Sequence, residues 1–247
     1  MTTREMTELI NRLGEITENK HGTLMKIIEY NGSSDVTVEF QDEHKAKTHT
    51  TYGAFKKHSV HNPYDKTAYD IGYIGEGKYK TGRKSGTRME YIWRCMLQRC
   101  YYEKEKHLHP AYYGICTVCD EWLNYQNFCD WYEENYYEAG DGRMHLDKDI
   151  LVRNNTVYSP ETCLIIPQRI NMIFMDKGNG RKTGIKEVHG RYEVNYAGVH
   201  IGTFDTFDDA TNAYDKKKRE HIRNVVNEYD GQLPQKVVDA LLAWQPQ

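Results

Sequence analysis

The residues best suited to chemistry are concentrated between Gly140 and Asn171, in the run GDGRMHLDKDILVRNNTVYSPETCLIIPQRIN. Within it, His145, Asp147 and Asp149 occupy alternate positions of an apolar-flanked stretch. Alternate residues of a strand project from one face, so the three side chains should lie together if the stretch is extended. Because carboxylate and amide oxygens suit a hard divalent cation, our first hypothesis for this run is a compact metal site.

A short series of elements must position these side chains. The run HLDKDIL predicts a strand, a polar loop containing Asn154 and Asn155 follows, and CLIIP predicts a second short strand. A helix is expected to open at Gln168. The expected order is therefore strand, loop, strand and helix.

The composition indicates a folded chain made of small modules. Of the 247 residues 38% are hydrophobic, and 20 tyrosines and 4 tryptophans supply bulky core material. No apolar run reaches the length of a membrane span, and the N-terminal sequence lacks the apolar segment of a signal peptide. We therefore expect a soluble, cytoplasmic protein with no membrane partner, whose 6 cysteines stay reduced.

Charge is distributed unevenly along the chain, although the net charge is only −3. Residues 81–106 carry 7 basic and 3 acidic side chains, a net charge of +4. Residues 107–150 carry 2 basic and 9 acidic side chains, a net charge of −7. Residues 181–224 carry 9 basic and 7 acidic side chains, a net charge of +2. An acidic centre between basic segments fits a metal-dependent nuclease that holds a polyanion from both sides, and it equally fits ordinary variation along a chain.

The patterns before the acidic centre predict an α+β fold. Residues 3–13 have the spacing of a short amphipathic helix. Between Gly22 and Gly75 the period changes to two, with a hairpin signal at Asn31-Gly32, which predicts a small β-barrel of the SH3-like kind. A Gly- and Lys-rich linker at 76–88 and two helices, at 89–104 and 122–136, are expected next.

The C-terminal part predicts a three-stranded sheet with one helix behind it. The sequence predicts three strands separated by tight turns: GIKEV, RYEVNYA and VHIGTF. It also predicts a helix capped by Asp205-Thr206. Arg191, Glu193 and Asn195 alternate with Tyr192, Val194 and Tyr196 along the second strand. One of these two sets must face away from the helix, and we expect the set containing Val194 to face it. A last helix is expected at about 234–244.

This C-terminal stretch resembles the Apetala/ethylene-response-factor type of DNA-binding domain. The resemblance rests on the opening Gly184-Ile185, on Ile201-Gly202-Thr203-Phe204 and on Ala213-Tyr214-Asp215, and it spans about 45 residues. It implies that the exposed face of the sheet binds double-stranded DNA in the major groove. By position, the DNA-binding residues would be Lys182, Lys186, Arg191, Glu193, Asn195 and His200.

The centre, from Trp93 to Asn171, resembles phage-encoded HNH (His-Me finger) endonucleases of the homing type. The resemblance rests on four motifs in order: WRCMLQRCY at 93–101, YGICTVCDEW at 113–122, LDKDI at 146–150 and YSPETC at 158–163. It implies a ββα-metal core that cleaves DNA phosphodiester bonds with one Mg²⁺ or Mn²⁺ ion. It also implies a cytoplasmic phage protein in the bacterial host cell.

The resemblance assigns roles to individual residues of the centre. Asp147 and Asn171 stand at the metal-binding positions, and Lys148 stands where the catalytic histidine is expected. A lysine beside Asp147 and Asp149 should keep its proton, so it makes a poor base. His145 is a candidate for a displaced base, and Asp149 belongs with His145 and Lys148 to the expected catalytic group.

Three functions therefore remain open: an active endonuclease, a catalytically silent HNH-like DNA-binding protein, and an interaction protein directed at a host factor. The modules would be residues 1–80 (N-terminal helix and barrel), 81–178 (HNH-like core) and 179–247 (DNA-binding sheet and helices). Cys116 and Cys119 form a single CxxC, whereas Cys95 and Cys100 are spaced so that a helix turns them apart. We therefore do not expect a structural zinc ion.

Overall fold

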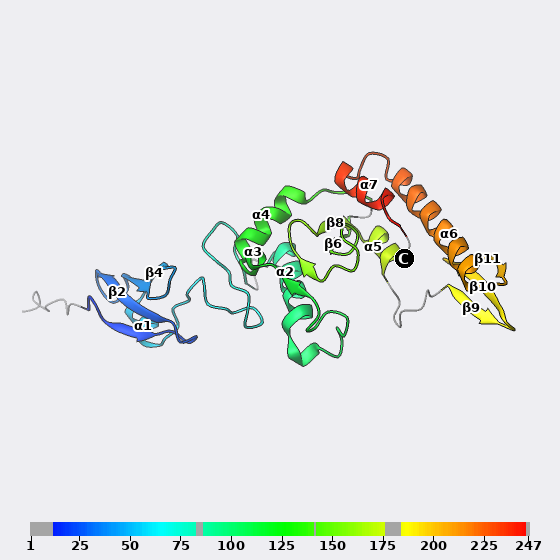
Figure 1. Ribbon diagram of the computed structural model, residues 1–247. Coiled ribbons are helices and arrows are strands. Elements are labelled where there is room, and N and C mark those ends of the chain that lie inside the picture. The colour runs from blue at the N-terminus through cyan, green and yellow to red at the C-terminus, as the bar shows by residue number, and fades with distance from the viewer. Residues whose placement is uncertain (1–11, 83–85, 141, 176–183, 246–247) are drawn as a thin grey trace, which may run out of the picture. The chain divides into compact units, whose positions relative to one another are not determined.

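The structure is a computed structural model that describes residues 12–82, 86–140, 142–175 and 184–245 (Figure 1). It divides into two compact units, Met1–Gly114 with Asp120–Cys129, and Ile115–Cys119 with Asp130–Gln247. Of the helix expected at 3–13, residues 3–11 lie outside the described residues, and Arg12 and Leu13 are not helical. Helices and strands are both abundant, so the predicted α+β class is confirmed.

The first unit begins with a four-stranded antiparallel sheet. Its strands are β1 (Ile16–Glu18), β2 (Leu24–Tyr30), β3 (Val36–Phe40) and β4 (Lys47–Thr50), paired in chain order, followed by the short helix α1 (Tyr52–Lys56). One side of β3 is fully buried at Val36, Val38 and Phe40, and Phe55 of α1 packs against the same cluster. Among the described residues the sheet is an open meander, and no closed barrel is present.

A tryptophan-rich cluster forms the rest of the first unit. Helix α2 (Arg88–Tyr101) is capped at its N-terminus by Thr87, whose hydroxyl accepts a hydrogen bond from Glu90 N. A 3-10 turn (Glu103–Glu105) and α3 (Asp120–Leu123) follow. Helix α4 (Tyr125–Asn135) comes next, and its residues up to Cys129 belong to this unit. The indole of Trp93 donates to the carbonyl of Trp122 at 2.7 Å, and both rings are fully buried. The two expected helices are therefore present, the second divided between α3 and α4.

The second unit contains the strand, loop, strand and helix expected between Gly140 and Asn171. Strands β6 (Met144–Asp147) and β8 (Leu164–Pro167) are antiparallel, and α5 (Gln168–Phe174) follows at once. Between them, β7 (Val157–Tyr158) pairs in parallel with β5 (Thr117–Val118). The apolar residues of the hairpin, Met144, Leu146 and Leu164 to Ile166, are buried and hold its two strands together, although β6 also carries His145 and Asp147.

The C-terminal sheet follows the expected pattern. Its strands β9 (Ile185–Val188), β10 (Arg191–Tyr196) and β11 (Val199–Phe204) are antiparallel, with β10 in the middle. Helix α6 (Phe207–Glu228) is capped at its N-terminus by Thr206, whose hydroxyl accepts a hydrogen bond from Asp209 N. Helix α7 (Gln235–Leu242) follows. Val194 is fully buried and Tyr196 nearly so, so the set of residues containing Val194 faces α6.

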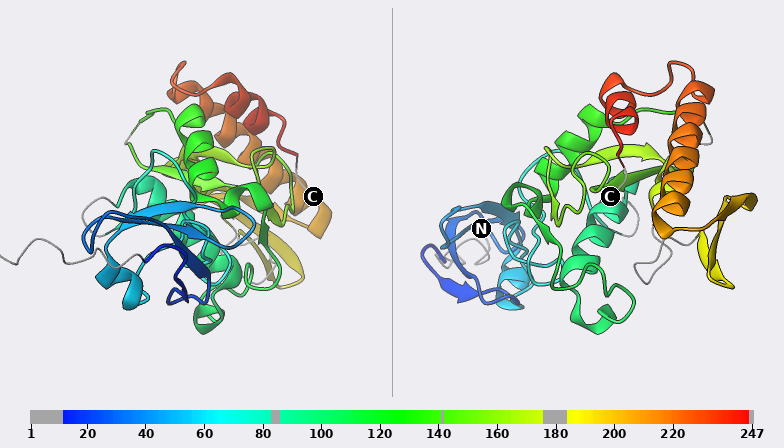
Figure 2. Two further views of the ribbon diagram at one scale, coloured as in Figure 1. Left: turned by 90° about the vertical axis from the view of Figure 1, so that its left-hand side faces the viewer. Right: turned by 45° about the vertical axis from the view of Figure 1, so that its right-hand side comes forward.

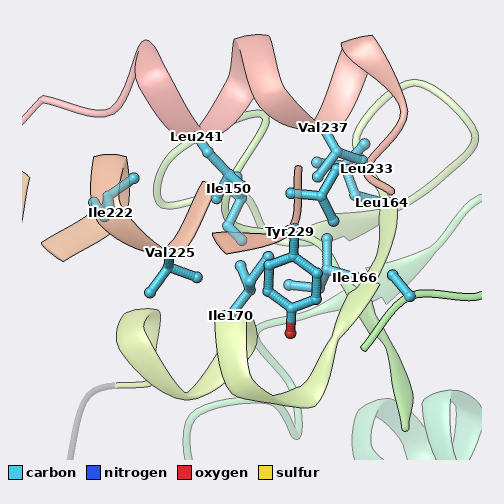
Figure 3. Close-up of a cluster of buried hydrophobic side chains, with 11 residues drawn as sticks. Ile150, Leu164, Ile166, Ile170, Ile222, Val225, Tyr229, Leu233, Val237 and Leu241 are labelled. Atoms are coloured by element: carbon cyan, nitrogen blue, oxygen red, sulfur yellow. The ribbon is translucent and has the colours of Figure 1, made fainter. Parts of the chain in front are cut away.

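Helix α6 also packs against the elements that carry the candidate site. Ile222, Val225 and Tyr229, at its C-terminal end, share one buried cluster with Ile166 of β8 and Ile170 of α5 (Figure 3). The three-stranded sheet lies against the first half of α6, and α7 lies against its last turns (Figure 2). The boundary expected at residues 178 and 179 is therefore crossed by a continuous hydrophobic core.

No helix in the described part of the chain combines the length and the apolar character needed to cross a membrane.

Candidate functional site

Strand β6 and helix α5 bring His145 and Asn171 into contact. Nδ1 of His145 lies 3.1 Å from Nδ2 of Asn171, although the residues are 26 positions apart. His145 is paired with Ile166 of β8, whose side chain belongs to the cluster that α5 covers. Directly paired residues share a face, so His145 projects toward α5. Both side chains remain partly exposed.

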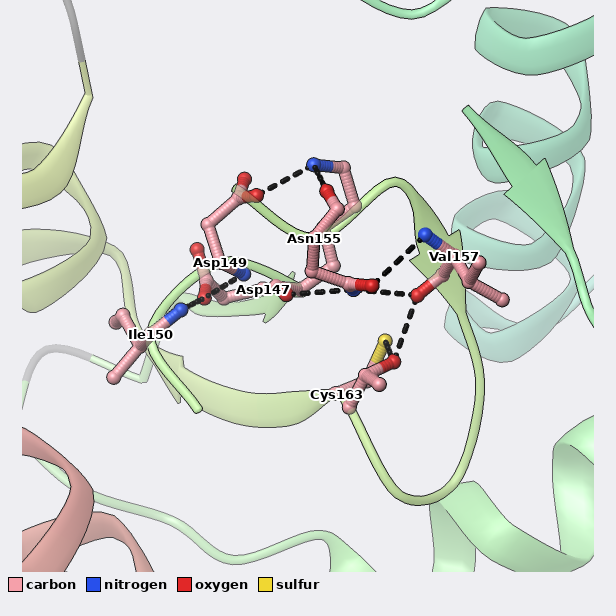
Figure 4. A network of polar contacts seen from close by, with 8 residues as sticks. Asp147, Asp149, Ile150, Asn155, Val157 and Cys163 are labelled. Atoms are coloured by element: carbon pink, nitrogen blue, oxygen red, sulfur yellow. Dashed lines mark hydrogen bonds and ion pairs between the residues drawn. The ribbon is translucent and has the colours of Figure 1, made fainter. Parts of the chain in front are cut away.

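Asp147 ends strand β6 and is 8% exposed. Its Oδ1 accepts hydrogen bonds from the backbone N–H groups of Asp149 at 2.9 Å and Ile150 at 2.8 Å (Figure 4). Burial raises the pKa of the Asp147 carboxyl, and these two N–H donors oppose the shift. The two hydrogen bonds turn the chain away from the strand direction directly after Asp147.

This turn corrects the expected position of Asp149. Strand alternation places His145 and Asp147 on one face, but the strand stops at Asp147 and does not extend to Asp149. The Asp149 carboxylate instead binds the ammonium of Lys148 at 2.6 Å and is about half exposed (side chain 44%). Asp149 is therefore part of the loop and does not belong to the face of β6 that carries His145.

Lys148 is 6% exposed and is held inside the loop that follows β6. Its Nζ donates to Asp149 Oδ1 and to the carbonyl of Asn155, both at 2.6 Å. The Asn155 amide returns a hydrogen bond to the carbonyl of Lys148 at 2.9 Å and donates another to the carbonyl of Val157 (Figure 4). At the position expected for a catalytic histidine, the lysine thus ties the two ends of the loop together.

The residues present fit one hard divalent cation by kind of donor. Within the described residues no cluster of three His, Cys, Asp or Glu side chains is present. Mg²⁺ needs only one or two protein carboxylates, because substrate phosphate and water complete its coordination. Oδ1 of Asp147 is taken by backbone N–H groups, which leaves Oδ2 as an anionic donor, and Asn171 adds an amide oxygen.

The cysteines are all free thiols. Cys100, Cys116, Cys129 and Cys163 are buried, and burial raises the pKa of Cys163 to about 12. A thiol with so high a pKa carries almost no thiolate at neutral pH, so Cys163 is chemically inert and acts as a small apolar residue.

The outer face of the C-terminal sheet gathers most of the residues expected to bind DNA. Arg191 and Asn195 of β10 are exposed, Glu193 lies between them and pairs with Lys186 of β9, and Asn195 pairs with His200 of β11. Lys182 lies outside the described residues.

The charges on this face are balanced. Arg191 Nε donates to the carboxylate of Asp205 at 2.7 Å, a partner that the strand pattern did not reveal because Asp205 lies in the loop before α6. Lys186 lies opposite Glu193 in the sheet. Counting only residues that the structure describes, the face therefore presents two cations, Lys186 and Arg191, and two carboxylates, Glu193 and Asp205.

Comparisons with protein-family models, curated proteins and solved structures found no match to this chain.

Proposed function

We propose that this protein is a DNA-binding endonuclease whose site is formed by β6, β8 and α5. One observation carries the proposal: the contact between His145 and Asn171 beside the buried carboxylate of Asp147. In this proposal the hairpin and helix are a ββα-metal core, the N-terminal sheet is an SH3-like module, and the protein acts in the cytoplasm of a phage-infected bacterium. The outer face of the β9–β11 sheet contacts the DNA.

His145 is the general base of the proposed reaction. In the structure Nδ2 of Asn171 faces Nδ1 of His145. The proposed reaction requires the Asn171 amide to be turned over, so that its oxygen accepts a hydrogen bond from Nδ1–H, and Nε2 then keeps its lone pair and can accept a proton. A water molecule gives that proton to Nε2 and attacks the phosphorus atom, and the bond from phosphorus to the leaving oxygen breaks. Asn171 is then a positioning residue, because it selects the tautomer.

Asp147 and Asn171 are the residues that would hold the Mg²⁺ or Mn²⁺ ion, Asn171 through the lone pair of its amide oxygen that does not accept from His145. Such an ion supplies positive charge that stabilises the phosphate and the leaving oxygen. The loop fixed by Lys148 and Asn155 keeps the backbone N–H groups of Asp149 and Ile150 on Oδ1 of Asp147, so the carboxylate has one orientation. We therefore assign Lys148 a structural part in the proposed site.

A second candidate function is DNA binding without cleavage. The network around Lys148 favours it, because the position expected for the base holds a buried, hydrogen-bonded ammonium. The third function, interaction with a host protein, would need neither DNA binding nor cleavage.

Plasmid nicking distinguishes these functions. Supercoiled DNA is incubated with Mg²⁺ or Mn²⁺ and the native chain, His145→Ala, Asp147→Ala or the control His107→Ala, whose histidine is exposed in the first unit. We expect His145→Ala to slow nicking by about 10²-fold to 10⁴-fold and His107→Ala to leave it unchanged. Salt-sensitive DNA binding without nicking by the native chain would leave the silent DNA-binding protein, and loss of both would leave the interaction protein.

A further inference from the structure

The solvent-facing side of helix α6 carries a line of cations that the proposed site does not use. Residues 216–223 contain 5 basic side chains and 1 acidic side chain, a net charge of +4. Lys216 and Arg223 are exposed and Arg219 is partly exposed. With 3.6 residues per turn these three fall within about 60° of one another, roughly opposite the buried Ala210 and Val225. We call Lys216, Arg219 and Arg223 the α6 basic stripe.

Neighbouring charges on α6 are already engaged. Lys217 Nζ donates to Glu220 at 3.1 Å, and Glu220 is the acidic side chain of this segment. Lys218 lies over the rings of Phe174 and Trp244, at 5.3 Å and 4.8 Å from their centroids. Lys217, and after it the charges of Lys216 and Arg223, lower the pKa of Glu220, but in the described part of the chain the structure shows no salt bridge for the cations of the stripe.

The spacing of the stripe suits a phosphate backbone. Lys216 and Arg223 are seven residues apart, which is about 10 Å along the helix and matches about three phosphates of one DNA strand. The stripe lies on the side of α6 away from the sheet, whose outer face is charge-balanced. Because no salt bridge holds them, these cations can reach phosphates without first leaving a carboxylate.

We propose that the α6 basic stripe is a second, sequence-independent contact surface for the phosphates of double-stranded DNA. This proposal rests on the proposed function only in that DNA is the ligand. Tyr196 of β10 contacts Tyr214 and His221, which lie on the side of α6 opposite the stripe. The stripe and the outer face of the sheet therefore point in opposite directions, so the stripe contacts a different segment of the duplex from the sheet. Phosphate contacts of this kind add affinity and salt dependence without sequence preference.

Salt-dependent binding tests the stripe. The probe is a random-sequence duplex of about 20 base pairs, titrated from about 50 mM to about 200 mM salt. In the variant Lys216→Ala/Arg219→Ala/Arg223→Ala the slope of log affinity against log salt should fall in magnitude by about 2.7, because each phosphate contact contributes about 0.9. Over this range the native chain should then lose about 40-fold more affinity than the variant.

Two controls make the test specific. Lys20→Ala/Lys26→Ala/Lys47→Ala removes the same charge from exposed positions of the first unit and should keep the native slope. The charge-preserving exchange Lys216→Arg/Arg219→Lys/Arg223→Lys should also keep it. If the alanine variant binds with the native slope, or if the two alanine variants lose equal slope, the stripe proposal is overturned.

The outcomes separate this proposal from the proposed function. A native chain that nicks no plasmid but shows the expected change of slope would overturn cleavage and support the stripe. A chain that nicks plasmid, with an unchanged slope in the stripe variant and a reduced slope in Lys186→Ala/Arg191→Ala, would overturn the stripe alone.

Discussion

Nδ1 of His145 and Nδ2 of Asn171 lie 3.1 Å apart, so the first strand and the helix of the candidate site meet at two polar side chains. The hydrogen bonds that end β6 at Asp147 and the buried Ile166 and Ile170 hold the strand and helix in this relation. The contact is the basis of the first prediction.

Asn171→Asp should move the pH dependence of cleavage. A carboxylate beside His145 favours the protonated imidazole and raises its pKa. A general base must be unprotonated, so the acid limb of the pH–rate profile should move to higher pH by about one unit. The profile of single-turnover nicking measures this, with the exposed Asn227→Asp on α6 as the control. An acid limb in its native position would count against His145 as the base.

Lys148→Met should lower stability. The buried ammonium donates to Asp149 Oδ1 and to the carbonyl of Asn155, and methionine leaves that carbonyl without its donor. We expect a loss of about 1–3 kcal/mol in the free energy of unfolding. Urea denaturation measures it, and Lys236→Met at an exposed position of α7 is the matched control. A variant with native stability but no nicking would instead identify Lys148 as a catalytic residue.

Gly140→Ala should be more costly than Gly142→Ala. Both glycines have positive φ, of 61° and 72°, so alanine is strained at either position by about 1–2 kcal/mol. At Gly140 the new Cβ would also lie 2.8 Å from Cε1 of the buried Tyr229, whereas at Gly142 it would meet nothing within 4 Å. Overpacking at Tyr229 should add about 1–3 kcal/mol. Equal losses in urea denaturation would show that Tyr229 does not pack against Gly140.

His221→Gln should reduce the loss of stability in mild acid. Tyr196 Oη lies 2.8 Å from Nδ1 of His221, and burial, followed by the charge of Arg169, lowers the pKa of His221 in the folded state. Between that lowered pKa and the ordinary value of about 6.5, the unfolded chain binds more protons. The contribution of His221 to stability is therefore complete above about pH 6.5 and is lost as the pH falls below it.

Thermal unfolding measured between about pH 8 and pH 5 tests this assignment. The melting temperature of His221→Gln should fall less steeply with pH than that of the native chain, and the exposed His189→Gln should follow the native curve. Parallel curves for all three proteins would mean that His221 contributes nothing to acid sensitivity.

The local elements of this protein can be predicted from patterns in its sequence. The period-two runs around Val194 and the tight turns between them predict the C-terminal sheet and which of its sides faces the helix, because alternation and turn chemistry act over a few residues. The apolar runs flanking Asp147 likewise predict the strand, loop, strand and helix of the candidate site. These signals are local, so one sequence is enough to read them.

The roles of Lys148, Arg191 and α6 depend on contacts between distant segments of the chain. Lys148 is buried because the carbonyl of Asn155, on the far side of a loop, accepts a hydrogen bond from its ammonium, and Arg191 binds Asp205 from a segment beyond the next strand. Helix α6 joins the sheet to the candidate site because Ile222 and Val225 meet Ile170 of α5, about 50 residues earlier in the chain. Such contacts depend on the positions of distant segments, so a local pattern of residue types does not predict them.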